Sequence, residues 1–187
     1  MSVQAASLMD VHTPLVGEWQ IDPAHSSVGF AVRHMMVAKV RGRFASFQGE
    51  LHIGPVPERS SATATIDAGS VDTGEPQRDA HLRSADFLDV TNHPTIEFRS
   101  TALRTAGGHR RLDGELTIRG TTRPVHLHLE LLGVQQMGGS QVAGFTATTE
   151  IDRHDFGLTW NQALEAGGVA VGRKLTIQLE IEAVRVR

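Results

Sequence analysis

The densest group of side chains capable of chemistry lies in residues 77–94, QRDAHLRSADFLDVTNHP, where arginines, histidines and aspartates alternate with apolar residues. Such a mixture can supply acid–base groups, bind an anionic head group, or serve only as a solvated connector. The chain has ten histidines in all. Among them His25, His34 and His81 are the candidates for a metal-dependent enzyme acting on a small molecule.

The remaining sequence gives this enzymatic interpretation little support. His126 and His128 share one strand face with Glu130, but a solvent-facing polar row explains that spacing. The chain contains no HExxH motif and no cysteine, and no serine, threonine or lysine stands in a recognisable nucleophile context. We therefore predict no catalytic residue and no metal ligand from motifs.

Composition sets further bounds on the class of protein. A length of 187 residues suits one domain, and a net charge of -3 argues against a nucleic-acid partner. No apolar run approaches the ~20 residues that span a bilayer, so we predict no transmembrane segment. The N-terminus has neither a basic leader nor the apolar stretch of a signal peptide, which predicts a cytoplasmic protein. Residues 1–16 are expected to form a flexible lead-in, and residues 17–187 a single domain.

Apolar and polar residues alternate over most of the chain, which predicts half-buried antiparallel strands. In PVHLHLELL and KLTIQLEIEAVRVR the apolar residues occupy every second position. In VRGRFASFQGELHI the apolar phase changes between Phe44 and Phe47, which indicates a bulge or a bend. The inward phase mixes large apolar residues with Gly, Ala, Ser and Thr, which favours an all-β, antiparallel β-barrel of about eight strands over a sandwich.

One short helix is predicted near residues 75–85. Pro76 suits a first helical turn, and Glu75 lies near the positive end of the helix dipole. Asp79 and Arg83 are four residues apart, so we expect them to pair with each other on the helix surface.

Four long segments of the chain resemble the YceI-like family. Their most specific parts are IDPAHSSVGFAVRH, RDAHLRSADFLDV and FGLTWN, and the resemblance extends from Trp19 to Val184. It implies a lipocalin-like antiparallel β-barrel with an elongated apolar pore, and a homodimer. It also implies non-enzymatic binding or transport of a long-chain amphiphile, most simply a polyisoprenoid or similar lipid, with no cofactor besides that ligand.

The pore residues that we predict are aromatic or aliphatic side chains. Strand phase and the predicted bend contribute most of them, and the FGLTWN segment of the resemblance contributes the last two: Val28, Phe30, Val32, Phe44, Phe47, Phe98, Phe145, Phe156 and Trp160.

A polar head group is predicted to contact His34, Arg78 and His81. His34 continues the apolar phase of its strand, and the other two lie on the helix that we expect to cap one end of the barrel. In the alternative interpretation Arg78 and His81 anchor the helix to the rim. The competing functions are the metal-dependent enzyme and a dimeric, stress-related scaffold whose barrel is filled by side chains.

Overall fold

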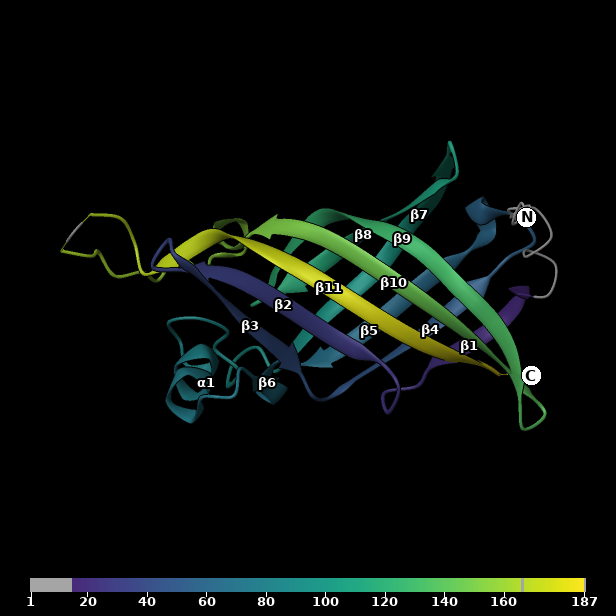
Figure 1. The fold of residues 1–187 in the computed structure, drawn as a ribbon, viewed down its shortest axis with the longest axis horizontal. Coiled ribbons are helices and arrows are strands. Elements are labelled where there is room, and N and C mark those ends of the chain that lie inside the picture. Colours follow the sequence, from purple (N-terminus) through teal and green to yellow (C-terminus); the bar gives the residue numbers. More distant parts are fainter. Residues whose placement is uncertain (1–14, 166, 187) are drawn as a thin grey trace, which may run out of the picture.

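The computed structural model describes residues 15–165 and 167–186, and it shows an antiparallel β-barrel with one helix beside it (Figure 1). The helix α1 spans Pro76–Arg83, and the single-turn 3-10 helices are η2 (Pro57–Arg59), η3 (Ala68–Ser70) and η4 (Arg153–Phe156). The strands are β1 (Gly17–Ile21), β2 (Ser27–His34), β3 (Ala38–Phe44), β4 (Phe47–Ile53), β5 (Ser61–Asp67), β6 (Val71–Asp72), β7 (Thr95–Ala106), β8 (His109–Ile118), β9 (Thr121–Met137), β10 (Ser140–Asp152) and β11 (Val171–Val186).

Pairing of β1 with β11 closes the sheet into a barrel. β1 and β2 lie end to end along β11, while β4 and β3 pair with them in the same order. β5 and β6 likewise lie end to end along β4 and β3. The strand segments therefore form eight barrel strands, and the predicted all-β fold is confirmed.

The change of apolar phase after Phe44 corresponds to a bend between β3 and β4. The backbone N–H groups of Ala45 and Ser46 leave the ladder and donate to the carbonyl and the hydroxyl of Ser70, at 3.1 and 3.0 Å. The interruption lets the phase restart, so Phe44 and Phe47 both line the barrel interior. A regular strand would place these two residues on opposite faces.

Helix α1 begins where the sequence predicts, with Glu75 as its N-cap accepting from the backbone N–H groups of Gln77 and Arg78. The expected Asp79–Arg83 pair is wrong. Asp79 is buried and accepts from the N–H and hydroxyl of Thr73, whereas Arg83 donates to the carbonyls of Gly69 and Val71. Both side chains thus hold the helix against the segment that precedes it. The carboxylate of Asp79 is buried, and its two hydrogen bonds with Thr73 offset the cost of removing it from water.

No helix in the described parts of the chain is long and apolar enough to cross a bilayer. The predicted lead-in falls mostly on residues 1–14, which lie outside the described residues. Leu15, at its end, is buried, and its carbonyl accepts from Trp19 Nε1 at 2.8 Å. This residue therefore packs with the barrel.

Two inward glycines leave space for phenyl rings along the barrel wall. A Cβ atom built on Gly42 would overlap the ring of Phe30, its partner across β2 and β3. A Cβ atom on Gly114 of β8 would overlap the ring of Phe98 in the same way. These rings therefore lie over glycine backbone, and the absence of a side chain there leaves the centre of the barrel less filled.

A charged cluster on the outer face joins three neighbouring strands. Asp113 of β8 is buried beneath Arg104, Arg111 and His126, whose nitrogen atoms lie 2.7–2.8 Å from its carboxylate. The hydrogen bond from Arg104 contributes most to holding the pKa of Asp113 well below its usual range. His126 and His128 are exposed, in agreement with a polar row on the outer face.

We expect Gly42→Ala to lower the free energy of unfolding by about 1–3 kcal/mol in chemical denaturation, because the new methyl group displaces the Phe30 ring. Phe30→Leu in the same chain should recover most of this loss. The control is Gly133→Ala, where a Cβ atom would meet open space. Equal stability of the two single variants would contradict the packing of Phe30 on Gly42.

Asp113→Asn should lower the free energy of unfolding by about 1–3 kcal/mol at pH 7, because three donors lose a charged acceptor. The folded-state pKa is depressed, so this stabilisation exists above the unfolded pKa of about 3.9 and declines as the pH falls below it. Denaturation at pH 7 and pH 3 measures both effects. Glu150→Gln, at an exposed Lys174 pair, is the control. A difference from wild type that is constant with pH would contradict this assignment.

Candidate functional site

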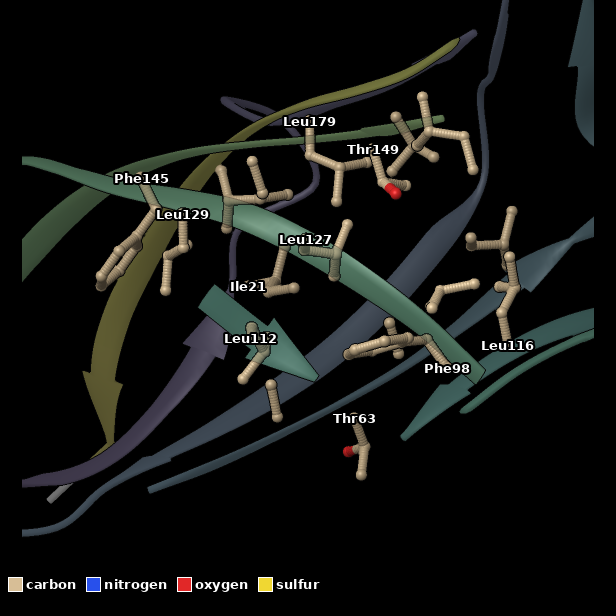
Figure 2. A pocket seen from close by; sticks show the side chains of 18 of the residues that line it. Ile21, Thr63, Phe98, Leu112, Leu116, Leu127, Leu129, Phe145, Thr149 and Leu179 are labelled. Carbon is tan, nitrogen blue, oxygen red and sulfur yellow. The ribbon is translucent and has the colours of Figure 1, made fainter. Parts of the chain in front are cut away.

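The barrel encloses an apolar cavity of about 280 Å³. A single water needs roughly 10–15 Å³ of such space, so the cavity has room for a chain of many carbon atoms. Figure 2 shows leucine and phenylalanine side chains from facing strands turned toward it, with Thr149 contributing a hydroxyl. Its lining includes Ile21, Leu51, Leu112, Leu116, Leu127, Leu129, Leu131, Ala147, Ile151, Leu175, Ile177, Leu179 and Ile181.

Most of the predicted pore residues line this cavity: Val28, Phe30, Phe44, Phe47, Phe98 and Phe145. The other three lie outside its lining. Phe156 is 2 % exposed and belongs to a packed cluster at one end of the barrel. Trp160 packs its ring 5.3 Å from that of Phe87, and Val32 is half-buried opposite Val40 of β3. Contact of any of these residues with a ligand stays a prediction.

The end of the cavity near α1 is closed by buried side chains. Phe87, Leu88, Phe156 and Leu158 form one packed cluster there, and Leu82 of α1 packs against it. This arrangement agrees with the expectation that the helix covers one end of the barrel. The cavity therefore has an apolar floor at this end.

Arg153 lies at this floor and was not predicted. It is 3 % exposed, and its guanidinium donates to the carbonyls of Leu158, Trp160, Val171 and Gly172 at 2.6–3.2 Å. Burial lowers its pKa from the ordinary value. Because its donors are engaged by backbone, Arg153 holds the segment that precedes β11. The inward alternation of β10, continued by one step beyond Ile151, would have identified it.

The three predicted head-group residues do not line the cavity. His34 is exposed at the end of β2, where it pairs with Val171 of β11 and Ala38 of β3 just before the chain turns, so its expected position inside the barrel is wrong. Arg78 donates to the hydroxyl and carbonyl of Thr73, at 2.7 and 3.1 Å. These contacts match the alternative in which Arg78 anchors the helix.

His81 is also held by the protein. Its Nε2 lies 2.8 Å from Asp86 Oδ2, and its ring packs edge-on against Phe87 and Trp160 at 5.0 and 4.6 Å. The contacts join α1 to the segment that follows it and to the loop before β11. A head-group role for this histidine stays a prediction.

The histidines considered for a metal-dependent enzyme are not brought together. His25 lies in the β1–β2 connection, with its Nδ1 at 2.8 Å from Asp22 and 3.6 Å from Glu182. The hydrogen bond between His25 and Asp22 raises the pKa of the histidine and lowers that of the carboxyl. These three residues are the metal-compatible group that the described residues contain, and they lie on the outer surface, away from the cavity lining.

The other end of the cavity has a more exposed lining. Leu103, Arg110, Leu129 and Leu131 all line the cavity and are only half-buried, whereas Leu88 and Leu158, which line it near α1, are buried. Arg110 was not predicted as a site residue, although it precedes Leu112 in the inward phase of β8. The cavity thus has a closed apolar end and a more accessible end that carries a cation.

Known proteins resemble this chain in sequence. An UPF0312 protein of Staphylococcus epidermidis is 35% identical over 169 residues, covering 88% of this chain and 96% of that protein. An UPF0312 protein of Vibrio cholerae is 38% identical over 138 residues, covering 72% of this chain and 73% of that protein.

Solved structures agree on the fold. BcnA of Burkholderia cenocepacia superimposes with a TM-score of 0.73 at 26% identity, covering 87% of this chain and 98% of BcnA. A polyisoprenoid binding domain from Saccharophagus degradans does so with a TM-score of 0.65 at 14% identity, covering 90% of this chain and 98% of that domain. The model of the YceI-like domain matches residues 19–183, so the chain belongs to the YceI-like family.

Proposed function

We propose that this protein binds a long-chain amphiphile, a polyisoprenoid or a similar lipid, in the barrel cavity and carries it without chemical change. The observation that carries the proposal is the apolar cavity of about 280 Å³ inside a closed barrel. Protein interiors are normally packed to high density, so a void of this size with apolar walls suits a hydrocarbon guest.

In this proposal the affinity comes from burial of the hydrocarbon chain of the guest. Each methylene removed from water contributes about 0.8 kcal/mol, so a guest of modest length already gains several kcal/mol. Ordering a flexible chain opposes binding, and for that reason affinity should level off once the cavity is full. Backbone pairing around the closed sheet holds the barrel wall, which keeps the cavity formed before the guest arrives.

The polar groups of the described lining favour binding over catalysis. His52 forms its hydrogen bond with Glu18, and Arg153 is engaged by backbone carbonyls. Thr149 adds one hydroxyl in the middle of an apolar wall. Such a lining offers positions for a polar group on a guest, whereas acid–base catalysis needs paired titratable groups at the reacting atom.

A solved structure with the same fold also supports this proposal. The domain from Saccharophagus degradans is described as polyisoprenoid-binding, and it shares the barrel with this chain. Transport of the lipid, assembly as a homodimer and a cytoplasmic location extend this proposal, following the sequence-based predictions.

We expect Ala147→Phe to reduce binding of the C20 isoprenoid alcohol geranylgeraniol at least tenfold. Ala147 is an inward residue of β10, 5 % exposed, that lines the cavity, so a phenyl group there occupies the space of the guest. Titration monitored by tryptophan fluorescence, with native mass spectrometry of the complex, measures the loss.

Thr148→Phe is the matched control, because Thr148 is exposed on the opposite face of the same strand. It should bind as wild type does. Far-UV circular dichroism should show strand structure in both variants. If a folded Ala147→Phe variant binds geranylgeraniol as tightly as Thr148→Phe, the guest does not occupy the cavity.

A further inference from the structure

Arg110 is a cation in the wall of a mostly apolar cavity. It is the second residue of β8, lies in the same inward phase as Leu112 and Leu116, and lines the cavity. Its register partners are Thr105 of β7 and Leu129 of β9. The hairpin joining β7 and β8 lies far from α1 (Figure 1), so Arg110 is at the end opposite the closed floor.

The neighbouring arginines of the same strands are paired on the outer face. Arg99 lies 2.8 Å from Glu115, while Arg104 and Arg111 lie 2.7 and 2.8 Å from Asp113. Arg110, in contrast, makes no side-chain hydrogen bond or ion pair within residues 15–165 and 167–186. No described residue therefore occupies its guanidinium donors.

The environment of Arg110 favours an anionic partner. Leu103, Leu112 and Leu129 surround its strand position, so its side chain is half-buried and partly removed from water. A partly desolvated guanidinium gains most from a charged acceptor, and its planar fork matches a phosphate or a carboxylate. Two other lining side chains with polar nitrogen atoms, His52 and Arg153, already have partners in the protein.

We propose that Arg110 binds the anionic head group of an amphiphile whose hydrocarbon chain fills the cavity toward α1. This inference rests on the proposed function and specifies the ligand class as a phosphate- or carboxylate-bearing lipid. It also gives the guest a direction: the tail packs toward Phe156 and Leu158, and the head stays at the more exposed end near Leu103 and Leu129. Arg78 and His81, at the α1 end, then serve the helix alone.

The test compares a neutral and an anionic guest with the same C20 tail, geranylgeraniol and geranylgeranyl diphosphate. Wild type should bind the diphosphate more tightly than the alcohol. Arg110→Met should weaken the diphosphate about tenfold or more, since a charge-assisted hydrogen bond is lost, while leaving the alcohol within about twofold. Arg110→Lys should retain part of the preference for the diphosphate.

Two controls separate Arg110 from general charge effects. Arg99→Met removes the same charge from an exposed outer-face pair and should change neither affinity. Arg78→Gln with His81→Gln removes the donors at the α1 end and should also leave the diphosphate affinity unchanged. A loss of diphosphate affinity in this double variant, with none in Arg110→Met, would place the head at the opposite end and overturn the inference.

The remaining outcomes distinguish this inference from the proposed function. If wild type binds both guests equally, or Arg110→Met weakens both equally, cavity binding stands and the role of Arg110 is overturned. If wild type binds neither guest, the proposed function fails and the inference fails with it.

Discussion

Closure of the sheet by the pairing of β1 with β11 is the constraint on which the rest of this structure depends. An open sheet buries its apolar face by packing against another layer, whereas a closed barrel satisfies its strand edges and can leave its centre unfilled. Gly42 and Gly114 help to leave the centre unfilled, because each allows a phenyl ring to lie over its backbone. The cavity is thus a property of the wall, and its apolar surface follows from the inward phase of the strands.

Charged side chains have different partners on the outer and inner faces of the barrel wall. On the outer face, Asp113 and its three partners cross-link β7, β8 and β9, and they contribute stability where water screens them only in part. On the inner face, Arg153 is bonded to backbone at the closed end, whereas Arg110, at the other end, has no side-chain partner among the described residues. The two ends of the cavity therefore differ: the end near α1 is packed with buried side chains, and the other end is more exposed and carries Arg110.

Sequence reasoning could predict the features that depend on local pattern. Alternation located the inward faces of β9 and β11, the change of phase located the bend after Phe44, and Glu75 with Pro76 located the start of α1. Alternation assigns a face but not a depth. It therefore could not show that His34, the last residue of β2, is exposed. Phe156, which the resemblance supplied, lies in η4, where strand alternation does not apply. The partners of Asp79 and Arg83 depend on the path of residues 69–73, which spacing along a helix does not contain.

The central claim is that the cavity holds a hydrocarbon guest, and native mass spectrometry of the purified protein before and after organic extraction tests it most directly. The account predicts an added mass that extraction removes, that belongs to a long-chain amphiphile, and that is restored when the amphiphile is returned to the folded, extracted protein. A protein that shows the mass of the chain alone before extraction, and that takes up no long-chain amphiphile afterwards, would contradict it.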